Sequence, residues 1–331
     1  MATIKTGVFD SNENEMQIVY DYEKLLKPHV YTADSIAFNQ SQLATVEAKI
    51  YETVYADIIF DKLIPIDTSV QPGSTSYVYY SVDAKGIGKF MTPQANDVPQ
   101  IEIDMKQHSI QVEFASLGYS YTSRELRTAA KAGVSLDAQK GKATFRVSQE
   151  HMQKCVMFGD EKYGVKGLFN HDNVTVITGT VDWATATFDE ILGELNVMLT
   201  TVPELSKQKF TPNTVCLPYN QFKHLGRLAG TSGQMNLFEY LKSKNIITTT
   251  TGVDLDIMGV SQLDDQGANS KGRAVIYEKN IDYASFAIAM PFTINPPSDL
   301  SSVNIKVETE YECAPGVGIK QPLSIVYYDF K

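Results

Sequence analysis

The feature that most constrains this chain is a pair of long extended arms around a turn-rich tip. The inner arm, Tyr77 to Val82, is rich in aromatic and β-branched residues, which favour strands. In the outer arm, from Ile101 to Phe114, apolar residues alternate with polar ones, as in a half-buried strand. Glycines and prolines between Lys85 and Pro99 supply turn residues. The pattern therefore predicts a β-hairpin between Ser74 and Tyr121.

This hairpin is too long to be covered by the rest of its own subunit. A two-stranded ribbon is at best marginally stable alone, because one of its apolar faces has nothing to bury it. We therefore expect the ribbon to need a partner, and another copy of the chain is the partner that we favour.

Composition and charge exclude several classes of protein. The 331 residues are 43% hydrophobic and 21% charged, which is typical of globular proteins. A formal net charge of -10 argues against a protein that binds nucleic acid through a general electrostatic field. No apolar run approaches the roughly 18 residues of a membrane span. Acidic residues also interrupt the N-terminal region where a secretory signal would be apolar. We expect no membrane partner and no export through such a signal.

The rest of the chain predicts an α+β protein. Capping boxes at Thr122-x-x-Glu125 and Thr187-x-x-Glu190 predict two helix starts. Ser135, with Asp137 in the first turn, predicts a long helix that ends at about Phe158. The other expected elements are an amphipathic helix from Gln42 to Phe60, helices from Pro218 to Leu228 and from Met235 to Lys244, and strands at Thr214–Leu217, Leu255–Val260, Arg273–Tyr277, Val303–Cys313 and Leu323–Phe330.

The long helix is locally basic in an acidic chain. A solvated helix face is the ordinary interpretation of such a charge run. The alternative is a surface turned toward a polyanion, which it would bind without reading bases. The residues that would form this surface are Lys140, Lys142, Arg146 and Lys154.

Motifs for catalysis, metal binding or cofactor binding are not visible. The five histidines have no metal-ligand spacing, and there is no phosphate-binding loop or serine nucleophile elbow. Cys155, Cys216 and Cys313 lie far apart in the sequence, as expected of small buried residues in a reducing compartment. We therefore predict no catalytic residue, no metal and no cofactor, and we expect that the protein is not an enzyme.

Three segments together resemble a known family. They are Tyr119-Ser120-Tyr121-Thr122-Ser123-Arg124-Glu125-Leu126, the helix end Phe158-Gly159-Asp160, and Gly164-Val165-Lys166-Gly167-Leu168-Phe169-Asn170. With the hairpin before them and the tail from Ala314 to Leu323 after them, they resemble the major capsid proteins of tailed bacteriophages. The resemblance is to the Hong Kong 97-type fold, within the group related to encapsulins, and covers about residues 45 to 331.

The resemblance implies an architecture for the whole chain. Residues 1–45 would be an N-terminal arm, and 74–115 would be the extended hairpin loop, or E-loop, that reaches over a neighbouring subunit. The peripheral domain would take 46–73, then 116–177 with a spine helix at 135–158, then 301–331, whose two returning strands would complete its sheet. Residues 178–300 would form the axial domain, which gathers around five-fold and six-fold axes.

The resemblance also implies a function and its partners. The chain would assemble with itself, as pentamers and hexamers, into an icosahedral shell around double-stranded DNA that it contacts without sequence specificity. Portal, scaffold or decoration proteins would be further partners, and the short polar arm implies a separate scaffold or none. The shell would be the capsid of a virion, assembled in the cytoplasm of the host bacterium. The residues expected at intersubunit contacts are Tyr79, Lys85, Ile87, Lys89, Phe90, Ile101 and Ile103.

Several alternatives stay open at this point. Lys85 or Lys89 could form a covalent cross-link to a neighbouring subunit, as in some relatives, although a turn lysine is usually only solvated. The same fold could form an encapsulin-like compartment around a cargo enzyme. A soluble cytoplasmic enzyme, with a site assembled from distant residues, is a third possibility.

Overall fold

The computed structural model describes residues 57–86, 90, 100–131, 135–226, 236–252, 254–298 and 303–331. The chain divides into two units, Met1–Tyr55 and Ala56–Lys331, and only the second is described below. The expected N-terminal arm lies outside the described residues. The same holds for the helix predicted from Gln42, except its last residues before α3 (Phe60–Leu63).

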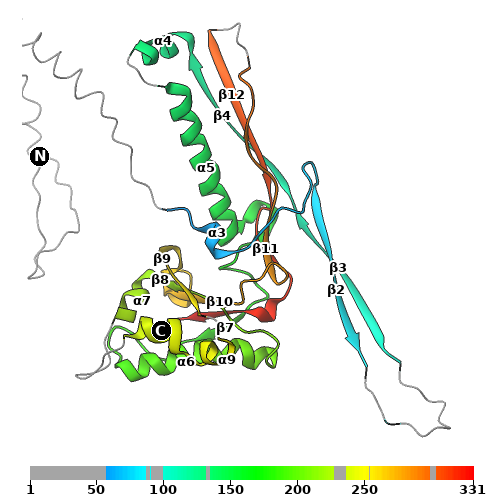
Figure 1. Ribbon diagram of the computed structural model, residues 1–331, viewed down its shortest axis with the longest axis vertical. Coiled ribbons are helices and arrows are strands. Elements are labelled where there is room, and N and C mark those ends of the chain that lie inside the picture. The colour runs from blue at the N-terminus through cyan, green and yellow to red at the C-terminus, as the bar shows by residue number, and fades with distance from the viewer. Residues whose placement is uncertain are drawn as a thin grey trace, which may run out of the picture. The chain divides into compact units, whose positions relative to one another are not determined.

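A long, mostly antiparallel sheet forms the first layer of this unit (Figure 1). Its strand order is β1-β11-β12-β4, and β13 also pairs with β11. β12 and β4 pair along their full length, from Asn304 opposite Thr122 to Cys313 opposite Glu113. The strands are β1 (Ile66–Asp67), β4 (Glu113–Thr122), β11 (Ala284–Ile294), β12 (Asn304–Cys313) and β13 (Gly318–Ile319).

The long helix α5 (Leu136–Phe158) runs beside this sheet and contacts β4 and β11 (Figure 1). Thr144, Ser148, Met152 and Val156 recur every fourth residue and are buried, which places them on one side of the helix. The helix therefore has a sheet-facing side and an exposed side. The predicted long helix is confirmed within one residue at its start.

The starts of α4 and α5 differ in how they are capped. At α4 (Ser123–Lys131), the Thr122 N–H donates to Glu125 (2.9 Å) and the Glu125 N–H donates to the Thr122 hydroxyl (3.2 Å), so this capping box is confirmed. Ser135 precedes α5 as predicted, but its side chain makes no capping hydrogen bond. Asp137 in the first turn instead accepts a hydrogen bond of 2.9 Å from the Tyr119 hydroxyl on β4.

The segment after α5 explains the glycine-rich motif. Asn170 accepts a hydrogen bond from the Gly167 N–H (2.8 Å) and donates one to the Phe158 carbonyl (2.9 Å). At Gly167 an added Cβ would collide with the backbone of Met157 and Phe158. At Gly159, whose φ is 75°, it would collide with the carbonyl of Val165. The glycines therefore let β5 (Gly159–Asp160) and β6 (Val165–Lys166) meet closely, and the asparagine ties the returning chain to the helix end.

A second five-stranded sheet has the order β7-β14-β10-β8-β9. Along β10, Val275 and Tyr277 join the core shared with the long sheet, whereas Ala274 and Ile276 pack in a second core with α6 and α9. A sheet buried on both faces requires such nearly continuous apolar strands. Its elements are β7 (Thr175–Thr178), α6 (Phe188–Ser206), β8 (Thr214–Pro218), α7 (Tyr219–Phe222), α8 (Leu237–Glu239), α9 (Ile246–Thr251), β9 (Asp256–Val260), β10 (Arg273–Tyr277) and β14 (Ile325–Asp329).

The strand order differs from the predicted domain division in two places. The strand predicted at Leu323–Phe330 does not complete the sheet that holds β12, because β14 pairs with β7 and β10 instead. Conversely, β11 lies within the predicted segment 178–300 but belongs to the long sheet. The chain therefore passes between the two sheets more often than its segmental pattern predicts.

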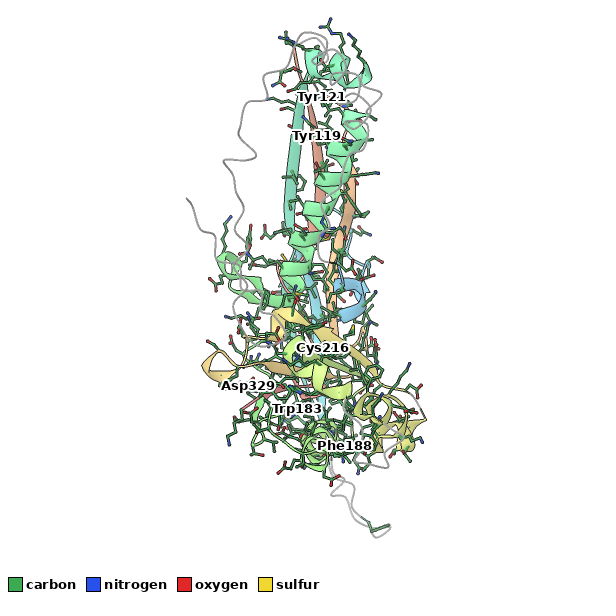
Figure 2. The ribbon with its side chains drawn as sticks, turned by 90° about the vertical axis from the view of Figure 1, so that its left-hand side faces the viewer. Tyr119, Tyr121, Trp183, Phe188, Cys216 and Asp329 are labelled. Atoms are coloured by element: carbon green, nitrogen blue, oxygen red, sulfur yellow. The ribbon has the colours of Figure 1, made fainter. Side chains whose placement is uncertain are left out.

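Two buried carboxylates stabilise the second sheet and its flanking loop (Figure 2). Glu194 on α6 accepts hydrogen bonds from the N–H groups of Thr180 (2.9 Å) and Val181 (3.0 Å) and from the indole of Trp183. Asp329 on β14 pairs with Arg273 on β10 through two contacts of 2.6 and 3.0 Å. Bidentate geometry of this kind gives the strong form of an ion pair.

Candidate intersubunit surface

The predicted hairpin is formed by β2 (Ser76–Lys85) and β3 (Glu102–Gln111). The two strands pair antiparallel from Ser76 opposite Gln111 to Lys85 opposite Glu102, and they form a sheet of their own. In Figure 1 the end of this ribbon that leads to the tip lies away from the helices and from the other sheets. The prediction of a long hairpin with its own pairing is confirmed.

The outer arm is shorter than the sequence pattern indicates. It was expected to continue through Phe114, but β3 ends at Gln111 and Val112 is buried in the core. The next residue begins β4, which pairs with β12 in the long sheet. The alternation of Ile110, Val112 and Phe114 with polar residues continues across the end of β3, so the pattern does not reveal that the pairing partner changes at Val112.

The base of the ribbon is anchored in its own subunit. Ile110 is buried, and Tyr77 and Tyr79 pack against the shared core. Tyr79 also stacks on His108, with 5.1 Å between ring centroids. Lys320 places its ammonium 5.8 Å and 5.9 Å from the centroids of the two tyrosine rings, within the range of cation–π attraction. These contacts fix the direction in which the ribbon leaves the subunit.

Beyond the base, one face of the ribbon is apolar and exposed. Because side chains alternate across a strand, the register places Val78, Tyr80, Ile103 and Met105 on the same face, here called the apolar ribbon face. Their exposed fractions are 38%, 60%, 61% and 64%, and Ile101 next to β3 is 72% exposed. Exposed apolar groups that adjoin one another on a surface of this kind are typical of interaction sites.

The opposite face is polar along the same stretch. Lys85 and Asp104 form an ion pair of 2.9 Å with both side chains more than half exposed, and an ion pair so placed contributes little stability. The Ser81 hydroxyl and the His108 ring are hydrogen-bonded at 3.1 Å. This face needs no cover from another subunit, so the two faces of the ribbon differ in what they require.

The seven predicted contact residues therefore fall into different environments. Tyr79 belongs largely to the anchored base, and Lys85 is paired on its own ribbon. Phe90, Ile101 and Ile103 are exposed, whereas Ile87 and Lys89 lie outside the described residues. Val78, Tyr80 and Met105 share the apolar ribbon face but were not selected from the sequence, because the facing register of two arms depends on the turn between them.

The four basic residues of α5 are not brought together in one surface. Lys140 donates a hydrogen bond of 2.6 Å to the Ser120 carbonyl, and its ammonium lies 5.9 Å from the Tyr121 ring centroid. Tyr121, near the end of β4, is labelled in Figure 2. Arg146 forms an ion pair of 2.9 Å with Glu150 on the next turn. Lys142 and Lys154 are exposed on the helix. Lys140 therefore joins the helix to its own sheet, and the exposed charge belongs to Lys142 and Lys154.

Within the described parts of the chain, no group of three or more histidine, cysteine, aspartate or glutamate residues could hold a metal ion. In the same residues, no helix combines the length and the apolar character that crossing a membrane would require.

Comparison with known proteins identifies the family. The sequence matches the family described as major capsid protein over residues 86–330, which is most of the chain. The chain belongs to the major capsid protein family. No curated protein sequence matches this capsid protein.

Solved structures of phage capsids share the fold of the capsid protein. The capsid of Myoviridae phage XM1 has a TM-score of 0.74 at 15% identity, and the match covers 92% of this chain and 100% of that one. A Gordonia phage Cozz structure has a TM-score of 0.56 at 11% identity, with 96% of each chain covered. The capsid of an empty GTA particle has a TM-score of 0.58 at 8% identity, covering 95% and 98%. The fold is the expected α+β, Hong Kong 97-like capsid fold.

Membership in this family confirms the leading interpretation of the sequence. The capsid protein is a phage major capsid protein, a structural subunit that associates with copies of itself into an icosahedral shell and is located in the virion capsid. The encapsulin-like and enzyme alternatives are not favoured by these matches.

Proposed function

We propose that this capsid protein encloses the double-stranded DNA of a tailed phage or prophage, and that the apolar ribbon face is the surface by which each subunit binds its neighbour. The observation that carries this proposal is a ribbon anchored at its base and exposed along one apolar face. Burying apolar area contributes about 25 cal/mol per Å². A neighbouring subunit would supply the cover that the ribbon lacks.

A closed shell requires each subunit to bind its neighbours through two different surfaces, so that repeated contacts close into a ring. A projecting ribbon fits this requirement, since it reaches a surface of the neighbour unlike its own. In this proposal the ribbon is the E-loop, α5 is the spine helix of the peripheral domain, and the second sheet with α6 and α9 is the core of the axial domain. The axial domain would meet its copies in pentamers and hexamers, with portal, scaffold or decoration proteins as further partners.

Assembly can be tested directly by expressing the full chain. We expect large closed particles in electron micrographs and fast-sedimenting material, formed in the bacterial cytoplasm without an added enzyme cargo. Particles purified from a phage lysate should contain double-stranded DNA. A protein that stays monomeric at every concentration, or particles that hold a protein cargo and no genome, would contradict the proposal.

Contact with the packaged DNA would come from the exposed side of α5. The subunit carries a formal net charge of -10, so strong general adhesion to DNA is not expected. Lys142 and Lys154 are exposed on this helix and could approach phosphates without base contacts. We propose that they face the interior of the shell. Lys140 is left out of this role because its ammonium is bound to Ser120.

Charge reversal at Lys142 and Lys154 tests this contact. The double substitution Lys142→Glu with Lys154→Glu should leave particle yield unchanged and weaken DNA retention, measured as DNA released against salt concentration. The matched control reverses Lys242 and Lys244, two exposed lysines after α8. Equal DNA release from the wild type, the test variant and the control would show that α5 does not contact the genome.

A further inference from the structure

Two of the three cysteines meet where the end of α5 packs on the long sheet. Cys155 lies in the last turn of α5 and Cys313 is the last residue of β12, and both residues line the same small cavity. Both side chains are buried, at 2% and 3% exposure. Cys216 lies apart from them on β8, 3.9 Å from the Tyr277 hydroxyl. The chain therefore carries one cysteine pair and one separate buried thiol.

A histidine with a fixed orientation completes this cluster. His151 lies one helical turn before Cys155, and its Nε2 is 3.8 Å from the Cys155 Sγ. Its Nδ1 is 2.9 Å from the Tyr311 hydroxyl. Burial raises the pKa of Tyr311 to about 12, so the hydroxyl keeps its proton and is able either to donate to Nδ1 or to accept from it. The hydrogen bond with Cys155 raises the pKa of His151 and so favours the imidazolium, whose Nε2–H donates to a Cys155 thiolate while its Nδ1–H donates to the Tyr311 hydroxyl.

The electrostatics of the pair make the two sulfurs unequal. The neighbouring Cys313 thiol, and then the His151 ring beside its sulfur, lower the pKa of Cys155. The neighbouring Cys155, together with burial, raises the pKa of Cys313. Because the His151 Nε2 lies 3.8 Å from the Cys155 sulfur, Cys155 is assigned as the nucleophilic thiolate and Cys313 as the resolving thiol. Low thiol pKa beside a second cysteine is the arrangement of cysteines that react with oxidants.

A small cavity gives access to both sulfurs. It has a volume of about 170 Å³, and Cys155, Cys313 and His151 line it together with Asp160 and Lys162. A site of this size admits a molecule as small as a peroxide, since one water needs only about 30 Å³. Its polar lining suits such a reagent better than a bulky thiol.

We propose that Cys155 and Cys313 are a redox site, and that a peroxide converts them into a reversible intrasubunit disulfide that joins the end of α5 to the end of β12. The Cys155 thiolate attacks one peroxide oxygen, an S–O bond forms and the O–O bond breaks. The leaving hydroxide takes the proton of protonated His151 and becomes water. The Cys313 sulfur then attacks the Cys155 sulfur, the S–O bond breaks, and the Cys313 proton leaves with the hydroxide as a second water. Two electrons pass from the sulfurs to the peroxide.

Such a bond would act after assembly. This step rests on the proposed function, in which the subunits form a phage shell. A subunit made in a reducing cytoplasm would keep both thiols, and a released particle would meet oxidising surroundings. The disulfide would then hold the long helix on its sheet, without any contact between subunits. The chemistry itself belongs to the single subunit and does not require a shell.

Peroxide treatment of full-length subunits, and separately of assembled particles, tests the site. After brief exposure the protein is denatured, alkylated and mapped by peptide mass. We expect Cys155 and Cys313 to escape alkylation as one linked peptide pair, with a mass about 2 Da below that of the dithiol, and dithiothreitol to restore both. Cys216 should remain alkylated, and it serves as the internal control in the same molecule.

Substitutions separate the roles of the residues. Cys216→Ser should leave the linked pair unchanged, whereas Cys313→Ser should stop oxidation at a sulfenic acid on Cys155. His151→Asn should slow peroxide consumption by on the order of tenfold, since Cys155 then lacks its nearest proton donor. The proposal is overturned if the wild-type pair stays fully alkylated, if Cys216 oxidises as fast as the pair, or if only disulfides between subunits form. Mapping of the wild type decides this even if a variant fails to fold, and a failure here leaves shell assembly untouched.

Discussion

Replacing Ile101 and Ile103 by alanine should raise the concentration needed for assembly while leaving the subunit folded. The two side chains are 72% and 61% exposed in the single subunit, so most of their apolar area is still available for burial. Complete burial of an isoleucine contributes about 1.5–3 kcal/mol, and the available fraction corresponds to about 1–2 kcal/mol for each. The double substitution therefore removes about 2–4 kcal/mol from each ribbon contact. Since 1.4 kcal/mol is tenfold, each contact weakens by roughly 30-fold to 1,000-fold.

Sedimentation and electron microscopy of particles across a concentration series measure this threshold. Thermal unfolding of the dissociated subunit should change by about 0.5 kcal/mol or less, because neither side chain is part of the core. Ile281→Ala is the matched control, since Ile281 is 42% exposed but lies outside the ribbon. An unchanged threshold in the double variant, or an equal rise in the control, would refute the assignment of the apolar ribbon face to a neighbouring subunit.

Three further predictions concern the subunit itself. Asp329→Asn should destabilise it by about 3 kcal/mol in urea unfolding, because the partly buried Arg273 guanidinium loses its charged partner; a change below experimental error would contradict this account of the pair. Thr187→Ala should cost about 1 kcal/mol. Hydrogen bonds from Thr187 lower the pKa of Glu190 in the folded protein. The stabilisation by this cap is therefore present at pH values above the ordinary carboxyl pKa and is lost as the pH falls below it. A Thr187→Ala variant whose stability depends on acid in the same way as the wild type would contradict this. Gly167→Ala should prevent correct folding, seen as loss of soluble protein, whereas Gly193→Ala in α6 has open space and should be tolerated.

Local sequence signals were sufficient wherever the determining contacts are also local. The capping box at Thr187 forms as predicted, with the Thr187 N–H donating to Glu190 at 2.8 Å. The strand at Arg273–Tyr277 has the predicted bounds, since an unbroken apolar run indicates burial on both faces. The exposed Ile101 and Ile103 were predicted on the same physical basis, because an alternating arm too long for its core must leave apolar groups uncovered.

Pairing between distant segments could not be predicted in the same way. The segment Leu323–Phe330 is an apolar strand by pattern, but nothing in its alternation says whether β12 or β10 is its neighbour. The break at Val112 is hidden for the same reason. The meeting of Cys155 with Cys313 depends on how α5 packs on the long sheet, and no spacing rule relates a helix end to a strand end so far along the chain.

The position of β14 has a consequence for how the protein is made. This strand lies between β7 and β10, yet it is the last strand of its sheet to leave the ribosome. Until β14 is synthesised, β7 and β10 each lack the strand that pairs with them on one edge. The second sheet can therefore be completed only after β14 has been synthesised, which delays competence for association until that point.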